Sequence, residues 1–175
     1  LVSYFTRLNY DLEGRYLVSA VFRTDGSSRF GNNRKWGNFP SLSLAWVLSE
    51  ERFMSNIESL NELKVRSSYG VSGNNNIGNY SYLGTISTVS YSAGNEITEG
   101  LVPGNLENPN LGWEKTVGLG IGLDISMFDN WFNLTLDYYD NRTSDLLYNV
   151  NVPAITGFTS ALSNIGEIRN YGGEL

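Results

Sequence analysis

The chain contains neither cysteine nor histidine among its 175 residues. Without cysteine it can form no disulfide bond and offers no thiolate, and without histidine it lacks the commonest metal ligand and general base. It also lacks long apolar runs: the longest span about five residues, as at 44–48, far short of the roughly 18 that a membrane-spanning helix needs. These absences exclude a disulfide-stabilised fold and a helical membrane protein.

Positive charge is also scarce, with 12 Lys and Arg against 18 Asp and Glu, a net charge of −6. This balance argues against a nucleic-acid partner. No nucleophile–base–orienter set can be assembled without histidine or cysteine. We therefore expect no catalytic residue, no metal site, no cofactor and no enzymatic activity.

Residues 113–147 show the strongest pattern in the chain, two long alternating segments joined by a very short turn at 128–130. One face of this hairpin is apolar, while the other carries glycine, threonine, asparagine and carboxylates. Strict period-two alternation predicts β-strands, and these segments are longer than most soluble strands. The apolar face comprises Val117, Leu119, Ile121, Leu123, Ile125, Phe132, Leu134, Leu136 and Tyr138.

Aromatic residues flank two of the short turns. Phe128, Trp131 and Phe132 surround the turn at 128–130, and Tyr10 and Tyr16 flank the turn at 11–14. Transmembrane β-barrels have an apolar outer band, a polar interior and aromatic girdles at both interfaces. We therefore predict that the apolar face meets outer-membrane lipid and that these five aromatic residues lie at the membrane interface.

The same alternation predicts an all-β, antiparallel fold with about seven membrane strands. Short connections at 11–14, 49–61 and 128–130 alternate with long ones near 25–39, 74–112 and 148–163, as periplasmic turns alternate with extracellular loops in such barrels. The expected strands are 1–10, 15–24, 40–48, 62–73, 113–127, 131–147 and 164–175. Those at 15–24, 62–73 and 131–147 would run outward. Seven strands cannot close an even-numbered barrel, and both ends lie within strand patterns, so residues 1–175 are expected to form a partial barrel domain.

Two local elements are expected within the connections. Ser49 is a plausible N-cap for a short helix over 49–60, with two glutamates in its first turn and a small apolar stripe. Residues 80–92 could form a local hairpin within the longest loop. The final strand should begin near residue 164.

Five charged residues are predicted to face the barrel lumen: Lys64, Arg66, Glu114, Asp124 and Asp137. Charges on an inward face are costly in a dry core and tolerable in a wet lumen. A salt-bridge and hydrogen-bond lattice that holds the wall and an internal plug is favoured over direct substrate contact. The segment 25–31 could suggest a cation loop, but one carboxylate is thin support, and a turn with Asp25 pairing to Arg29 is favoured.

Three tyrosines in the longest loop, Tyr80, Tyr82 and Tyr91, are candidates for contact with a substrate or with a lid protein. Aromatic rings in polar loops offer a large contact area with a polar handle, which suits sugar stacking or protein contact. The alternative is that they pack locally within the loop.

Several strings together resemble the SusC/RagA family of TonB-dependent outer-membrane transporters of Bacteroidetes. They are DGSSRFG (25–31), WGNFPS (36–41), the S-x-E-x-F pattern from Ser49, LNELKVRSSYGVSGN (60–74), NPNLGWE (108–114), DYY (137–139), TSDLL (143–147) and NIGEIRNYGGEL (164–175). Gly173 departs from the family pattern, which usually has a β-branched residue there. The resemblance covers nearly the whole chain.

The resemblance implies a barrel of about 22 strands with a plugged lumen. It implies import of glycans or peptides powered through TonB, and a SusD-like lipoprotein that covers the barrel from outside. The plug and the TonB-contacting segment are expected outside these residues. Two alternatives remain open: a soluble β-sandwich that binds carbohydrate or acts as an adhesin, and a diffusion porin. The first leaves the apolar faces and aromatic turns unexplained, and the second leaves the family motifs unexplained.

Overall fold

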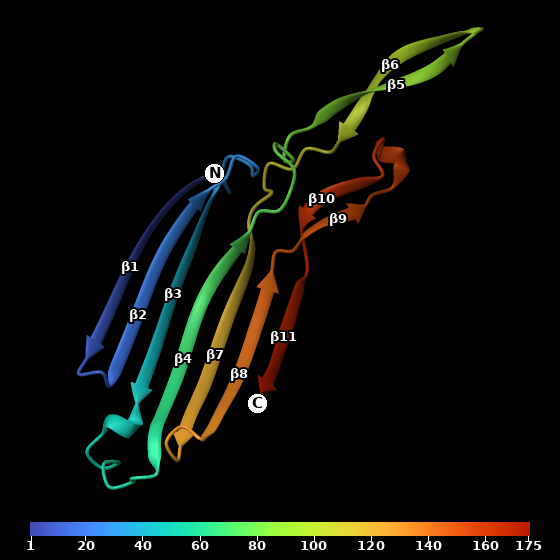
Figure 1. The fold of residues 1–175 in the computed structure, drawn as a ribbon. Coiled ribbons are helices and arrows are strands. Elements are labelled where there is room, and N and C mark those ends of the chain that lie inside the picture. The colour runs from blue at the N-terminus through green and yellow to red at the C-terminus, as the bar shows by residue number, and fades with distance from the viewer.

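The computed structural model describes residues 1–175, which form one long, curved antiparallel sheet with two smaller hairpins at one end (Figure 1). The sheet has seven strands, and each is hydrogen-bonded to the next across the sheet. In spatial order they are β1 (Val2–Leu12), β2 (Tyr16–Gly26), β3 (Trp36–Val47), β4 (Leu60–Asn74), β7 (Glu114–Met127), β8 (Phe132–Ser144) and β11 (Glu167–Glu174). The expected all-β, antiparallel fold is confirmed.

One hairpin, formed by β5 (Thr85–Ala93) and β6 (Glu96–Asn105), interrupts the path between β4 and β7 and extends away from the sheet (Figure 1). The expectation of a hairpin over 80–92 was wrong in its position. Gly94, with φ of 71°, provides the turn, so residues 85–93 form only its first strand. The second strand, β6, was not expected, because it contains two glycines and a proline, which interrupt the alternation and argue against a strand.

The other small hairpin was missed in the sequence, where 148–163 reads as a loop. In the structure β9 (Leu147–Asn151) pairs with β10 (Ser160–Asn164), and the short 3₁₀ turn η2 (Ala154–Thr156) joins them. Pro153 and Gly157 lie in this connection and concealed the five-residue strands around it. Gly166, with φ of 85°, then separates β10 from β11, which is why the final strand begins at Glu167 and not near 164.

The expected helix over 49–60 is absent. Only the 3₁₀ turn η1 (Leu48–Glu50) forms, followed by single turns in which Met54 N–H donates to the Glu51 carbonyl and Ile57 N–H to that of Met54. Ser49 caps nothing, and its buried hydroxyl has no hydrogen-bond partner. Isolated short helices are unstable unless an apolar face packs, and Phe53 in this connection is 65% exposed.

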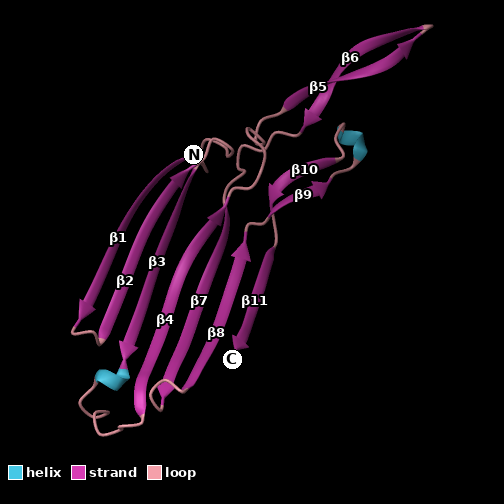
Figure 2. Cartoon of the chain, viewed as in Figure 1, coloured by secondary structure: helices cyan, strands magenta, loops and turns pink.

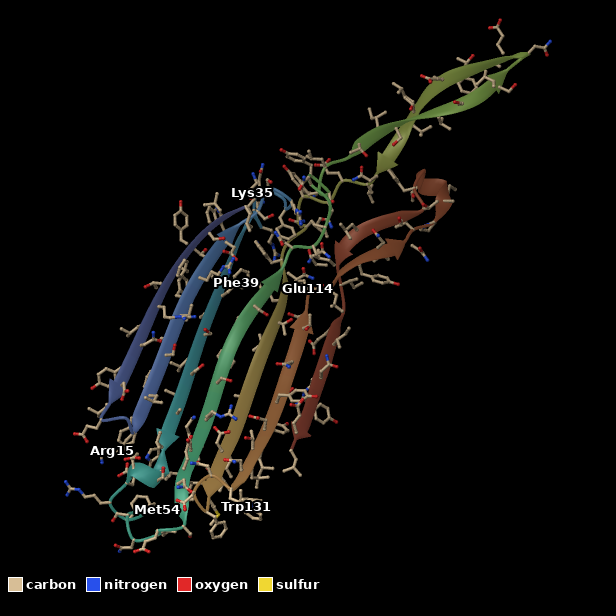
Figure 3. All side chains as sticks on the ribbon, viewed as in Figure 1. Arg15, Lys35, Phe39, Met54, Glu114 and Trp131 are labelled. Carbon is tan, nitrogen blue, oxygen red and sulfur yellow. The ribbon has the colours of Figure 1, made fainter.

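The connections divide between the two ends of the sheet. The turns near 13–15, 48–59 and 128–131 lie at one end, and the loops and both small hairpins lie at the other (Figure 2). Figure 3 shows Arg15, Met54 and Trp131 at the turn end, with Lys35 at the loop end. No helix in the structure is long and apolar enough to cross a membrane.

The pairing register gives the sheet two different faces. Trp46 pairs with Val65, Val65 with Leu123 and Leu123 with Leu136. Directly paired residues project to the same side of a sheet, so an apolar row crosses four strands. The next row lies on the other face and contains Lys64, Asp124 and Thr135.

Few side chains are buried, because no second layer covers either face. The only cluster of buried hydrophobic residues sits at the loop end and comprises Phe30, Phe39, Leu111 and Trp113. The large apolar surface of the sheet itself therefore remains open, with Leu44, Tyr69, Ile121 and Tyr138 among its exposed members.

Candidate functional site

The apolar face carries aromatic pairs at both of its ends. Near the turns, Tyr16 stacks on Trp46 with ring centroids 6.1 Å apart. Near the loops, Tyr4 stacks on Trp36 with centroids 6.2 Å apart. The register places all four rings on the face that also holds Leu44 and its apolar neighbours.

The spacing of the two belts can be estimated along β3. Trp36 and Trp46 lie on the same face ten residues apart, or about 33 Å at about 3.3 Å per residue. The tilt of barrel strands, about 40°, reduces this to a height of about 25 Å, which matches the apolar band of outer-membrane barrels. The two belts thus have the separation of the two interfaces of a membrane.

Two charged pairs also lie on the apolar face, on β8 and β11. Arg169 donates to Asp140 from Nε at 2.8 Å and from Nη2 at 2.6 Å. Arg142 donates to Glu167 from Nη2 at 2.7 Å. These paired charges follow Tyr138 along β8, where the register places Asp140 opposite Leu119, and their partners lie on β11, the edge strand of the sheet.

On the opposite face, Arg66 is the centre of an ionic network that joins three strands. It donates to Asp124 from Nε at 2.7 Å and to Asp137 from Nη2 at 3.0 Å. Lys64 Nζ lies 3.6 Å from Asp124 and 3.2 Å from Glu62. The structure therefore brings together Lys64, Arg66, Asp124 and Asp137 of the five residues predicted to share a face.

Glycines on β7 leave room for this network. A Cβ atom at Gly122 would lie 2.7 Å from the Arg66 guanidinium carbon and 2.5 Å from Asp137 Oδ1. Gly118 and Gly120 similarly lie close to Asn141 and Ser68 on the adjacent strands. These glycines lie on the polar face of the β7–β8 hairpin. Because they have no side chains, they leave room for the side chains of β4 and β8 to lie across β7.

Glu114 lies on the same face but belongs to a different group at the loop end (Figure 3). It accepts hydrogen bonds from Asn74 Nδ2 at 3.0 Å and from Leu147 N–H at 3.1 Å. It therefore connects β4 with the start of the β9–β10 hairpin and does not take part in the Arg66 network.

The buried cluster at the loop end, the rim core, is built from the family-like motifs. Phe30 packs against Trp113 with ring centroids 5.0 Å apart, and Phe39 meets the same indole edge-on at 5.2 Å. Trp113 Nε1 donates to the Lys35 carbonyl at 3.0 Å, and Gly31 N–H donates to the Leu111 carbonyl at 3.2 Å. Segments 25–41 and 108–114 are therefore fixed together.

The asparagines of these loops extend the rim core. Asn164 bridges three segments: its Oδ1 accepts from Gly112 N–H at 2.7 Å, and its Nδ2 donates to the carbonyls of Gly112 and Asp145. Asn108 Nδ2 donates to the Leu162 carbonyl at 3.0 Å. Backbone groups that no strand satisfies are thereby paired by side-chain amides.

The expected pairing of Asp25 with Arg29 is wrong. Asp25 is buried and accepts from Arg23 Nε at 2.8 Å, two residues back along β2. Arg29 instead donates to the Asn75 carbonyl at 2.9 Å and to Asn79 Oδ1 at 3.2 Å. The only carboxylate of segment 25–31 is neutralised by this pairing, which leaves little to attract a cation.

The structure places the predicted interface aromatics at the turn end. Tyr10, Tyr16 and Phe132 share the apolar face, while Phe128 and Trp131 lie in the β7–β8 turn, where Trp131 is 84% exposed. Residues 128–130 all have positive φ, which lets the chain reverse within this very short connection.

The three loop tyrosines lie in three different environments. Tyr82 packs against the rim core, as the local-packing alternative requires. Tyr91 lies on the β5–β6 hairpin beside Gly100. Tyr80 is exposed and has φ of 58°.

Sequence reasoning missed one polar cluster at the turn end. Glu51 accepts hydrogen bonds from Tyr16 Oη at 2.5 Å and from Trp46 Nε1 at 3.1 Å, and Arg15 Nη1 lies 3.5 Å away. The bond from Tyr16, then that from Trp46 and the charge of Arg15, hold the pKa of the Glu51 carboxyl below its usual range, against the opposing effect of burial. The acidic pair at 50–51 reads as a helix start, which concealed this role.

Comparison with known proteins identifies relatives over the full length of the chain. The chain is 43% identical over 178 residues to the TonB-dependent receptor P39 of Formosa agariphila, covering 100% of this chain and 17% of that protein. It is 40% identical over 180 residues to the TonB-dependent receptor SusC of Bacteroides thetaiotaomicron, covering 99% of this chain and 18% of SusC. The chain therefore spans less than a fifth of the relatives it matches.

Solved structures give the same answer. The RagAB peptide importer in its closed-closed state matches with a TM-score of 0.87 and 32% identity, covering 98% of this chain and 18% of that one. Its open-open state matches with a TM-score of 0.85 and 33% identity, again over 98% and 18%. The family model described as "TonB dependent receptor-like, beta-barrel" matches residues 2–175. The chain belongs to this family of TonB-dependent receptor β-barrels.

Proposed function

We propose that this chain is part of the wall of an outer-membrane, TonB-dependent nutrient importer. The observation that carries the proposal is the pair of aromatic belts, Tyr4–Trp36 and Tyr16–Trp46, which bound an apolar band of membrane thickness on one face only. Both edges of the sheet, β1 and β11, pair on one side only. Further strands of a longer receptor would complete the barrel.

In this proposal the Arg66 network faces the lumen. A large barrel keeps its interior polar, either as a channel or in contact with a plug. Lys64, Arg66, Asp124 and Asp137 would hold three wall strands in register and present polar groups to a plug domain, with no catalytic role. Glu114 would fix the wall to the loops above it.

The loops would face the cell exterior and meet the partners. The resemblance to SusC and to the RagAB importer supports a SusD-like surface lipoprotein as partner, with TonB acting through another part of the receptor. RagAB imports peptides. The cargo class proposed at this level is therefore a glycan or a peptide.

The membrane topology can be tested by site-directed spin labelling of the full-length receptor in proteoliposomes. Spin labels on single cysteines at residues 133–136 should alternate in their accessibility. Labels at Leu134 and Leu136 should be accessible to oxygen, and labels at Asn133 and Thr135 to a water-soluble nickel reagent. Uniform access to the nickel reagent would overturn the membrane assignment and favour a soluble β-sandwich.

The transport function can be tested in cells. Deletion of the receptor gene should abolish uptake of one nutrient, and complementation should restore it only when TonB is present. Uptake that continues without TonB would favour a diffusion porin and contradict the proposal.

A further inference from the structure

A cleft of about 720 Å³ opens between the two small hairpins at the loop end. One wall is formed by residues 76–85 and 103–106, and the other by β9, β10 and the segment that joins them. The volume lies within the range of about 300–1,000 Å³ that is usual for ligand sites. The cleft is separate from the Arg66 network, which lies on β4, β7 and β8.

The lining of the cleft is polar but carries no charge. Its polar members include Asn76, Asn79, Asn105 and Asn149, and its aromatic members are Tyr80 and Phe158. The stretches that form the walls contain no Asp, Glu, Lys or Arg anywhere within 67–95, 103–106 or 146–166. Arg29 donates to Asn79 Oδ1 at 3.2 Å but is not among the residues that line the cleft.

This lack of charge limits the ligand. An ionised group that enters a cleft loses hydration and needs an opposite charge to replace it. The cleft offers none, so a uronate, a sulfated sugar or a peptide with charged side chains would bind poorly. A neutral ligand that carries many hydroxyl groups needs no opposite charge, so the lack of charge in the cleft does not weaken its binding.

Two of the amides are free to bind such a ligand. Asn105 is occupied, since it accepts from Thr85 N–H at 2.9 Å and donates to the Leu83 carbonyl at 2.6 Å. The side chains of Asn76 and Asn149 are exposed and make no hydrogen bond within the chain. Each offers one acceptor and two donors, which matches the mixed demand of sugar hydroxyls.

Tyr80 supplies a second sign of function. Its φ of 58° places it in the left-handed region, where a bulky aromatic residue is a clear outlier. A strained backbone conformation persists only where the surrounding structure holds it in place. Such conformations cluster at active sites and at ligand-binding positions. Tyr80 is exposed and lines the cleft, and the half-buried Phe158 is the other aromatic residue of its lining.

We propose that this cleft binds an uncharged oligosaccharide, with Tyr80 and Phe158 stacking on sugar rings and with Asn76 and Asn149 bonding to hydroxyl groups. Aromatic faces suit the apolar faces of pyranose rings, and primary amides suit their hydroxyls. This inference rests on the proposed function, of which it names the cargo class.

The test is binding by the purified full-length receptor with its surface partner. Isothermal titration would use short homo-oligomers of glucose, mannose, xylose and galactose, an oligogalacturonate, and a serine–asparagine peptide with acetylated and amidated ends. At least one neutral oligosaccharide should bind. Tyr80→Leu and Phe158→Leu should each weaken it by about tenfold, which corresponds to about 1.4 kcal/mol.

Tyr148→Leu is the matched control. Tyr148 lies on β9 between Leu147 and Asn149, both of which line the cleft, but is itself outside the lining and exposed. It should leave the affinity unchanged. Tyr80→Phe should keep most of the affinity, because the ring remains.

Four results would overturn the inference: no neutral oligosaccharide binds, the oligogalacturonate binds better, the capped peptide binds better, or affinity is the same in all variants. A receptor that inserts and imports in a TonB-dependent manner, yet gives any of these results, would refute the cleft assignment alone. A receptor that fails the topology or TonB test would refute the proposed function itself.

Discussion

Arg66 and Asp124 form a two-point ion pair across neighbouring strands, with Nε to Oδ2 at 2.7 Å and Nη2 to Oδ1 at 3.0 Å. The same Nη2 reaches Asp137 on the next strand. Parallel bonds of this kind fix geometry as well as charge. One guanidinium thus holds three strands of the wall in register.

Replacing Arg66 by methionine should therefore destabilise the receptor, because two neighbouring carboxylates lose their shared partner. The Arg66 side chain is 38% exposed, so solvent screening limits the loss to about 1 kcal/mol. Urea unfolding of the full-length receptor in detergent would measure it. Arg52→Met, in the exposed turn after η1, is the control, and equal stability of the two variants would contradict the role of Arg66.

Alanine at Gly122 should disturb the same network without removing any charge. Its Cβ would lie 2.7 Å from the Arg66 guanidinium carbon, which forces the ion pair to shift. Gly173→Ala is the matched control, since its Cβ would meet only an ordinary contact at 3.7 Å. Unfolding should show a loss at Gly122 and little change at Gly173. If both were tolerated equally, the glycines of β7 would not be needed to accommodate these side chains.

Arginine at Ile121 should destabilise the inserted receptor by about 2–4 kcal/mol, the cost of a cation near the membrane midplane. Leu134→Arg should cost less, because Leu134 lies two residues from Phe132 at the interface. Thr135→Arg, adjacent but on the other face, should be tolerated. Refolding into vesicles would measure all three, and a neutral result at both Ile121 and Leu134 would reverse the assignment of the two faces.

The lowered pKa of Glu51 predicts that the stability of the receptor depends on pH. The folded-state pKa of Glu51 is lowered, so its contribution to stability is present above the unfolded value, about 4.3, and is lost as pH falls through the lower folded value. Glu51→Gln should thus lower the thermal unfolding temperature at neutral pH, and the difference from wild type should shrink below about pH 4. Glu58→Gln, in the same connection, should behave as wild type at every pH. A difference between Glu51→Gln and wild type that does not change with pH would contradict this interpretation.

Truncating the rim core should loosen the loops more than the wall. Phe30 is fully buried between the loop segments, and Phe30→Ala should cost about 3–5 kcal/mol locally. Limited proteolysis of the receptor in intact cells should then cut within 26–35, while the strands remain protected. Phe53→Ala, at an exposed position, is the control and should leave the cleavage pattern unchanged. An unchanged pattern for Phe30→Ala as well would mean that other contacts hold the loops.

The strands of the wall could be predicted from the sequence, because the alternation that reveals a strand depends only on residues close together in the chain. Alternation along residues 113–127 and 131–147 reveals both faces, and Gly14 marks the first turn. The loops were harder, because hairpins such as β5–β6 depend on one residue, Gly94, and contain the glycines and proline that usually argue against a strand. The failed helix at 49–60 shows that caps and charge pattern are insufficient when an apolar stripe has nothing to pack against.

The candidate cleft could not be predicted in this way. It depends on two uncharged stretches, 67–95 and 146–166, that lie far apart in sequence and meet only because β4, β7 and β8 are neighbours. Their lack of charge is visible in the sequence, but their proximity is not. Likewise the expected partner of Asp25, Arg29, was wrong, because only the strand geometry brings the Arg23 guanidinium to this carboxylate.

The Glu51 carboxylate, hydrogen-bonded to both aromatic residues of the turn-end belt, has a mechanical consequence. It opposes a shift of the wall along the membrane normal toward the loop side, because that displacement would bring an ionised carboxylate into hydrocarbon. A bilayer of different thickness must then deform around the protein. The receptor would thus perturb the lipid beside this wall, and neighbouring receptors could lower that elastic cost by gathering together.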